Sequence, residues 1–270
     1  ERYDILSANP IEKIISHGQI TYVEDKDGIN EFKSDPIDIV RATMKKYPSE
    51  VSDLPFTGGA IGYLSYDLGN YYEGIGIKDS NIDVPLMAFG IYDWAVIIDH
   101  HKKNTTLVYR NKDSSIDKIK SCLEKKMFDK NKENSFSINS VCKSNITHEE
   151  YKEKFSKIQS YIKGGDCYQI NFSQRFSMEY SGDTWDIYNK ITPSYSSPYS
   201  AYINMPFIKI MSFSPERFLS YDGNIVETKP IKGTRPVSDD KNINKQLMKE
   251  LSESYKERAE NLMIVDLLRN

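Results

Sequence analysis

The tripeptide Asp222-Gly223-Asn224 lies between two β-prone runs, and it constrains the fold more than any other stretch of this chain. Glycine and asparagine accept the positive φ of a tight turn, so residues 212–218 and 227–234 are expected to pair as the arms of a β-hairpin. Pairing about this turn brings Glu216 and Lys232 to the same end of the hairpin. They miss direct register by about three residues, roughly 10 Å at the rise of a strand, which leaves room for a substrate between them.

Glu216 and Lys232 suit acid-assisted nucleophilic chemistry, because a carboxyl group can protonate a leaving group while an amine attacks. Pro230 and Gly233 flank the lysine. Proline fixes φ and glycine allows close approach of a substrate or another backbone, so Lys232 is expected at a shaped bend. The alternative is a surface hairpin with a solvated lysine and glutamate, and on spacing alone that alternative is the commoner outcome.

Composition limits the class of protein. The chain has 270 residues, 39% of them hydrophobic and 12% aromatic, enough for one large or two ordinary domains with a real core. A net charge of −3 argues against nucleic acid as the main partner. No run approaches the roughly eighteen apolar residues of a membrane span, and the start is no signal peptide. The three cysteines form no C-x-x-C motif, so a reducing cytoplasm is the expected compartment.

Residues 1–110 are predicted to form mostly strands, among them 54–67 and a buried strand over 90–99. A helix is expected over residues 36–44, with Pro36 in its first turn. The glycines of Gly58-Gly59-x-x-Gly62 lack the lysine of a phosphate-binding loop and indicate close backbone packing instead. A charged helix is predicted over 117–128. The polar stretch 111–144 then divides the chain into regions 1–144 and 145–270.

The second region begins with a predicted helix. Thr147 and Glu150 form a capping box, an apolar face follows at helical spacing, and Gly164-Gly165 ends the helix. Residues 167–176 alternate apolar and polar and are predicted to form a strand, with Gln169 on a polar face that is either solvent-exposed or the wall of a site. Further strands are expected over 201–203 and 207–213.

A long helix is predicted from about Lys245. It places Glu253, Glu257 and Glu260 on one face. Such a stripe usually faces solvent, but its carboxylates could also offer oxygen ligands to Mg²⁺.

A resemblance to a known family rests on four runs in this order: Gly-Asp-Cys-Tyr-Gln-Ile-Asn-Phe-Ser-Gln-Arg-Phe at 165–176, Ser-Pro-Glu-Arg-Phe at 214–218, Lys-Pro-Ile-Lys-Gly-Thr-Arg-Pro at 229–236 and Arg-Ala-Glu-Asn-Leu-Met-Ile-Val-Asp-Leu at 258–267. With these runs the chain resembles the chorismate-utilising enzymes. The resemblance implies an α+β fold of two large antiparallel sheets packed face to face with flanking helices. Residues 1–144 would be the N-terminal region of a synthase component I, and 145–270 the first part of the chorismate-binding catalytic domain.

Lys232 distinguishes branches of the family. Pro-Ile-Lys-Gly-Thr resembles the aminodeoxychorismate synthase branch of folate biosynthesis, whereas anthranilate synthases look like Pro-Ile-Ala-Gly-Thr. Gln169 points the same way, because the isochorismate and salicylate enzymes carry a lysine there. The alternatives are an anthranilate synthase component I and an inactive fragment that retains a tryptophan-type pocket.

The resemblance also implies roles for individual residues. Glu216 would protonate the C4 hydroxyl of chorismate as it leaves, while Lys232 adds covalently at C2; ammonia from a class I glutamine amidotransferase subunit would then attack C4 and expel the lysine. Glu260 matches a ligand of Mg²⁺. Gln169, Gly233 and Thr234 would bind substrate, and Pro198, Tyr199 and Ser200 resemble a segment that lines a tryptophan pocket.

The family pattern is incomplete at the C-terminus. Family members continue with a Gly-Ser-x-Thr-Gly-Ala-Pro-Lys run and a second metal-binding glutamate, neither of which is in this sequence. Both termini look cut from something longer. A chain that ends at Asn270 is therefore predicted to be inactive alone, because it cannot complete the site for Mg²⁺ and the substrate carboxylates.

Overall fold

The computed structural model describes residues 2–48, 52–75, 83–110, 114–124, 136–195 and 197–269. The protein is α+β with antiparallel sheets, as expected. Contacts between residues divide the chain into a first unit, residues 1–129 with 203–209, and a second unit, residues 130–202 with 210–270. The predicted domains 1–144 and 145–270 stay a prediction.

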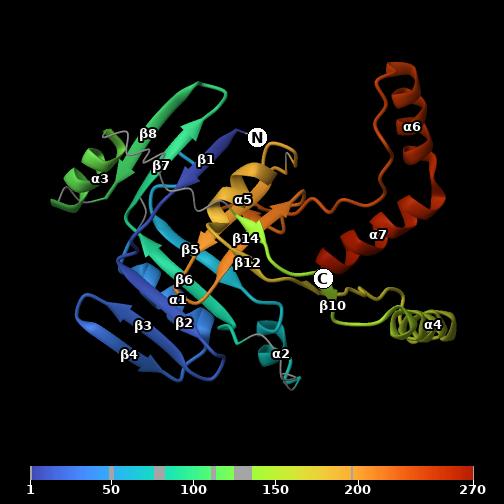
Figure 1. Cartoon of the computed structure of the whole chain (residues 1–270), viewed down its shortest axis with the longest axis horizontal. Coiled ribbons are helices and arrows are strands. Elements are labelled where there is room, and N and C mark those ends of the chain that lie inside the picture. The colour runs from blue at the N-terminus through green and yellow to red at the C-terminus, as the bar shows by residue number, and fades with distance from the viewer. Residues whose placement is uncertain are drawn as a thin grey trace. The chain divides into compact units, whose positions relative to one another are not determined.

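The first unit is built on a five-stranded antiparallel sheet (Figure 1). Its strands, in spatial order, are β4 (Gly28–Phe32), β3 (Thr21–Asp25), β2 (Glu12–Ser16), β6 (Met87–Tyr92) and β5 (Gly59–Leu64). Buried and half-buried residues alternate along β2, as expected of a strand with one face on the core. Ile14 of β2 packs in one apolar cluster with Ile39 of helix α1 (Pro36–Lys45), which therefore helps to cover the buried face.

Helix α1 confirms the helix predicted over 36–44. The carboxylate of Asp35 accepts the backbone N–H groups of Ile37 and Asp38 and caps the helix. At the other end, Lys46 Nζ lies 3.1 Å from the buried carboxylate of Glu12, and Tyr47 Oη donates to it at 2.7 Å. Burial and this hydrogen bond raise the pKa of Tyr47 to about 12. The buried charge of Glu12 is thus paired, and it ties the end of α1 to β2.

The glycines near β5 confirm the predicted close packing of backbones. A Cβ atom at Gly58, whose φ is +111°, would lie 2.9 Å from the carbonyl oxygen of Tyr92. At Gly62 a Cβ atom would lie 2.0 Å from the carbonyl oxygen of Ala88. The strand expected over 90–99 proves to be two strands, because a bend at Asp93 separates β6 from β7 (Trp94–Asp99).

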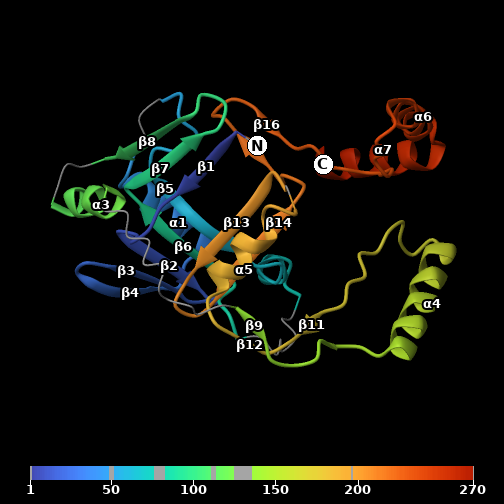
Figure 2. The same cartoon turned by 45° about the horizontal axis from the view of Figure 1, so that its top comes forward.

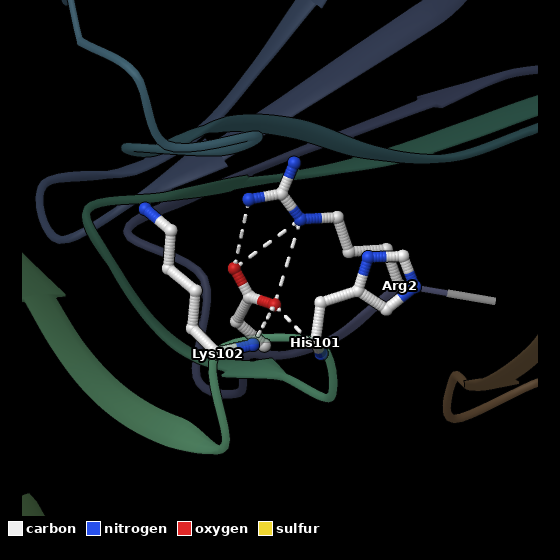
Figure 3. Close-up of polar contacts among 4 residues, drawn as sticks. Arg2, His101 and Lys102 are labelled. Carbon is white, nitrogen blue, oxygen red and sulfur yellow. Dashed lines mark hydrogen bonds and ion pairs between the residues drawn. The ribbon is translucent and has the colours of Figure 1, made fainter.

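The described part of the first unit also contains a three-stranded sheet. β7 lies between β1 (Tyr3–Leu6) and β8 (Asn104–Tyr109), and Figure 2 shows β1 beside β7. Asp99, at the end of β7, accepts the backbone N–H groups of His101 and Lys102 at 2.9 and 3.0 Å and pairs with Arg2 at 3.1 Å (Figure 3). Burial alone would raise the pKa of Asp99, but these donors outweigh it and lower the pKa to about 2.

Helices α2 (Leu68–Tyr72) and α3 (Ser114–Glu124) also belong to the first unit. Helix α3 confirms the predicted charged helix as far as residue 124. The rest of that prediction, residues 125–128, lies outside the described residues.

The second unit contains four helices and short strand pairs in its described part. The helices are α4 (His148–Gly164), α5 (Thr184–Ile191), α6 (Lys241–Glu253) and α7 (Tyr255–Arg269). The pairs are β9 (Ser137–Ile138) with β12 (Tyr180–Ser181), β10 (Lys143–Ser144) with β11 (Phe176–Ser177), β13 (Tyr199–Asn204) with β14 (Lys209–Ser214), and β15 (Ser220–Tyr221) with β16 (Val226–Glu227). The strands expected over 201–203 and 207–213 are thereby confirmed as β13 and β14.

Aromatic rings hold α5 against the β13–β14 pair. The ring centroids of Trp185 and Tyr202 lie 4.9 Å apart, and those of Tyr188 and Phe213 lie 5.2 Å apart. The hydroxyl groups of Thr184 and Tyr202 share a hydrogen bond of 2.9 Å. These contacts form a local aromatic cluster in the second unit.

Helix α4 confirms the capping box. The Thr147 hydroxyl accepts the N–H of Glu150, the Glu150 carboxylate accepts the N–H of Thr147, and Gly165 ends the helix with a φ of +80°. The strand predicted over 167–176 is wrong, because only Phe176 and Ser177 pair, with β10. A strand needs a neighbour for its backbone groups, and no other described strand lies beside residues 167–175.

The long helix predicted from Lys245 is also corrected. It begins earlier, at Lys241, where the carboxylate of Asp240 caps it. Extended backbone at Ser254, with a ψ of 114°, then separates α6 from α7. Across the described ranges of the chain, we find no helix long and apolar enough to cross a membrane.

Asp99→Asn should lower the melting temperature, because the Arg2 ion pair and two backbone hydrogen bonds lose a carboxylate acceptor. The folded pKa of Asp99, about 2, lies below its unfolded value of about 3.9, so the stabilisation is present above pH ~4 and is lost as the pH falls towards 2. Melting curves of wild type and variant should therefore differ most near pH 7 and converge between pH ~4 and 2. Asp27→Asn, in an exposed turn, is the control, and a constant difference at all pH values would contradict the account.

Candidate active site

A hairpin forms about the predicted turn, but the predicted arms 212–218 and 227–234 do not pair with each other as strands. β15 and β16 pair antiparallel, with Ser220 opposite Glu227, and the carboxylate of Asp222 accepts the N–H groups of Asn224 and Ile225 inside the turn. Gly223 supplies the positive φ, +99°. The ladder is only two residue pairs long, so strand pairing reaches neither the Ser-Pro-Glu-Arg-Phe run nor the lysine of Pro-Ile-Lys-Gly-Thr.

Beyond the ladder, polar side chains join the two arms. Glu227 is paired with Arg217 Nη2 at 2.6 Å and with Lys229 Nζ at 2.8 Å. The hydrogen bond from Lys229, together with the charges of Lys229 and Arg217, lowers the pKa of Glu227. Thr228 Oγ1 adds a hydrogen bond of 2.7 Å to the carbonyl oxygen of Phe218. The arms are therefore fixed to each other close to Glu216.

Arg217 makes a further contact. Its guanidinium carbon lies 5.9 Å from the centroid of the Tyr199 ring, a cation–π distance. Its Nε is buried and has no hydrogen-bond partner among the residues that the structure describes. Tyr199, expected in a tryptophan pocket, thus has a cation on its ring in this structure. Pro198 is exposed, and the half-buried Ser200 donates its hydroxyl hydrogen bond to Ser197 at 2.8 Å.

Glu216 lies in a tight turn directly after β14. Its N–H donates to Ser214 Oγ at 3.3 Å, and the same hydroxyl donates to the Glu216 carbonyl at 2.8 Å. Glu216 and Lys232 are both half-buried. Neither hydrogen bond nor ion pair joins these two residues in the described part of the chain. Their predicted roles as proton donor and nucleophile stay predictions.

The Pro-Ile-Lys-Gly-Thr segment lies against α6 and α7. Gly233 has a φ of +69°, and a Cβ atom there would lie 2.6 Å from Glu257 Oε2 and 2.8 Å from Leu251 Cδ1. Two residues on, Arg235 Nε lies 3.1 Å from Glu250 Oε1 and Nη1 lies 3.6 Å from Glu257 Oε1. The backbone next to Lys232 is thus packed on the helix pair and held there by charge.

The other predicted substrate and metal residues are more scattered. Gln169 and Thr234 are exposed, while Glu260, on α7, is half-buried. Mg²⁺ can bind through a single carboxylate when water and substrate supply the remaining oxygens, so Glu260 suits it, whereas Glu257, one turn earlier on α7, is paired with Arg235. No group of three or more His, Cys, Asp or Glu side chains converges among the residues that the structure describes. The Mg²⁺ site stays a prediction.

Arg235 is the residue that sequence reasoning missed. The sequence showed Glu257 only as part of a carboxylate stripe, whereas the structure pairs it with an arginine from the preceding loop. No local spacing connects the two positions. The arginine inside Lys-Pro-Ile-Lys-Gly-Thr-Arg-Pro was the available sequence signal, because it places a further cation close to Lys232 that needs a carboxylate partner if it is buried.

Comparison with known proteins decides the family. The sequence matches the chorismate binding enzymes over residues 2–270. The chain belongs to this family. It is 39% identical to aminodeoxychorismate synthase component 1 of Escherichia coli (strain K12), over all of this chain and 59% of that protein. It is 31% identical to anthranilate synthase component 1 of Acetivibrio thermocellus, again over all of this chain and 59% of that protein.

The solved structures give a similar result. The crystal structure of anthranilate synthase component I from Streptococcus pneumoniae TIGR4 superposes with a TM-score of 0.86 at 28% sequence identity. The match covers 100% of this chain and 61% of that chain. Our chain therefore spans about three fifths of the length of its relatives.

Gly233→Ala should destabilise the protein more than Gly223→Ala. Both glycines have positive φ, which costs about 1 kcal/mol for alanine, but space around Gly223 is open. At Gly233 the new methyl group must also displace the Glu257 carboxylate and the Leu251 side chain, so we expect this overpacking to cost about 1 kcal/mol more. Urea unfolding of both variants measures the difference, and equal losses would show that Gly233 is not packed against α7.

Proposed function

We propose that this chain is the chorismate-binding part of an aminodeoxychorismate synthase component I. Such an enzyme converts chorismate and ammonia to 4-amino-4-deoxychorismate, in the biosynthesis of para-aminobenzoate and folate. The observation that carries the proposal is Lys232 itself, a half-buried lysine in Pro-Ile-Lys-Gly-Thr, next to backbone that is packed on α6 and α7. The 39% identity to the Escherichia coli synthase supports it.

The chemistry needs one proton donor and one nucleophile. In the proposed reaction the neutral amine of Lys232 forms a bond to C2 of chorismate, the ring double bonds shift, and the C4–O bond breaks. Glu216 gives its proton to the departing hydroxyl, which leaves as water. Ammonia then bonds to C4, the double bonds shift back, and the C2–Nζ bond breaks to return the free lysine.

The fixed arms of the hairpin favour this assignment. Glu216 follows β14 in a turn closed by Ser214, and its neighbour Arg217 is anchored to Glu227 on the other arm. Both reacting side chains therefore extend from backbone whose position is restrained, which is what an orientation-dependent displacement requires.

The reaction also needs a metal ion, contacts to the substrate and a source of ammonia. Glu260 would hold Mg²⁺, whose charge offsets the carboxylate of chorismate when the ion is bound. Gln169, Gly233 and Thr234 would contact the substrate. Ammonia would be supplied by a class I glutamine amidotransferase subunit, which makes the working enzyme a heterodimer in the cytoplasm.

The second candidate function is that of an anthranilate synthase component I, in which ammonia attacks C2. The 31% identity to the Acetivibrio enzyme and the structural match to the Streptococcus enzyme favour it. Lys232 disfavours it, because an amine already placed at C2 would compete with ammonia for that carbon.

Lys232→Ala in the full-length protein should reduce formation of 4-amino-4-deoxychorismate at least about a hundredfold, since the nucleophile is removed. The dissociation constant of chorismate should change little. The variant carries Pro-Ile-Ala-Gly-Thr, so any remaining amination should move to C2. Chromatography of the products, with ammonia as the nitrogen source, measures both effects.

Lys245→Ala, an exposed lysine on α6, is the matched control and should behave as wild type. An unchanged rate of 4-amino-4-deoxychorismate formation in Lys232→Ala would remove this lysine from the mechanism. Anthranilate as the main product of the wild type would favour the second candidate.

A further inference from the structure

The segment that carries Lys232 has no secondary structure to hold it. Residues 228–239 are neither helix nor strand. In the described structure, no backbone hydrogen bond connects residues 229–237 with another element. Side-chain contacts must therefore set the position of this segment.

Those contacts lie on both sides of Lys232. On the N-terminal side, Lys229 pairs with Glu227 at 2.8 Å, but its side chain is 73% exposed. On the C-terminal side, Arg235 is only 24% exposed and reaches two carboxylates, Glu250 of α6 and Glu257 of α7. Ion pairs of partly buried groups are screened less by water and salt, so the Arg235 contacts should restrain the segment more.

We propose that Arg235 is a positioning residue that holds the Lys232 segment against helices α6 and α7. Its Nε pairs with Glu250 at 3.1 Å, its Nη1 lies 3.6 Å from Glu257, and Nη1 also donates to the carbonyl oxygen of Thr234 at 2.9 Å. One side chain thereby links both helices to the backbone two residues after Lys232.

The guanidinium group suits this task. Its donors form a rigid planar fork that can engage two carboxylates and a carbonyl oxygen at once, whereas the ammonium of lysine is a single point charge on a flexible stem. Gly233 completes the arrangement, because the lack of a Cβ atom lets the backbone approach Glu257 and Leu251. A lysine at position 235 should therefore replace only part of the contact.

The consequence for the reaction rests on the proposed function. Lys232 lies in a loop, and Glu260 lies one turn beyond Glu257 on α7. Because Arg235 joins the loop to α7, it fixes the nucleophile relative to the helix that would hold the metal. A displacement of about 1 Å at a reacting group can cost about a hundredfold in rate.

The test compares Arg235→Ala with wild type in the full-length protein. We expect kcat for 4-amino-4-deoxychorismate formation to fall about 10- to 100-fold while KM for chorismate and the melting temperature change little. Arg235→Lys should restore part of kcat. Lys249→Ala removes an exposed ion pair on α6, with Glu253, and should have no effect.

The rate of cleavage by trypsin measures how firmly the Lys232 segment is held, independently of enzyme activity. Proline follows both Lys229 and Arg235, so Lys232 is the one residue between 229 and 236 after which trypsin can cut. In Arg235→Ala, cleavage after Lys232 should speed up severalfold, as identified by mass spectrometry, and Glu250→Gln should give a smaller increase.

Wild-type cleavage rates and wild-type kcat in Arg235→Ala would overturn the inference. A parallel loss of kcat and melting temperature, without rescue by Arg235→Lys, would also overturn it, because Arg235 would then serve the fold as a whole. A wild type that forms no 4-amino-4-deoxychorismate would count against the proposed function instead. In that case the trypsin cleavage rates still test whether Arg235 restrains the segment.

Discussion

Two ion-pair clusters fix the segment that carries Lys232, and the candidate active site depends on them. Glu227 joins the hairpin arms through Arg217 and also pairs with Lys229, at the start of the segment. Arg235 joins its other end to α6 and α7. Between these clusters the backbone makes no hydrogen bond to another element among the described residues, so charge and close packing replace a strand or helix. A loop held in this way can present a lysine to a substrate without burying it in a sheet.

The sequence predicted those parts of the fold that depend on neighbouring residues. The capping box of Thr147 and Glu150 and the hairpin turn at Gly223 were both found, because their hydrogen bonds close within a few residues. The strand predicted over 167–176 does not form. Alternation shows only that a strand is possible, and pairing needs a partner distant in sequence. The break between α6 and α7 at Ser254 also escaped prediction, since its neighbours favour helix.

The candidate site also has parts that the sequence predicted and parts that it did not. Motif order pointed to the family and to Glu216 and Lys232; the family is confirmed, and the roles of the two residues stay predictions. Spacing about the turn did not place these two residues on paired strands, since the two-pair ladder stops short of both. The pairing of Arg235 with Glu250 and Glu257 joins a loop to two helices, and no periodicity in the sequence connects those positions. The packing of the chain decides which cation a carboxylate on a helix face pairs with, and sequence periodicity does not predict that packing.

The proposed reaction requires Lys232 to form a covalent bond to chorismate. The most direct measurement is the intact mass of the full-length protein after incubation with chorismate in the absence of ammonia and glutamine, followed by peptide mapping. The account predicts a mass increase equal to chorismate less one water, located on the peptide that contains Lys232 and absent from Lys232→Ala. An unmodified Lys232 in protein that nevertheless forms 4-amino-4-deoxychorismate when ammonia is added would contradict it.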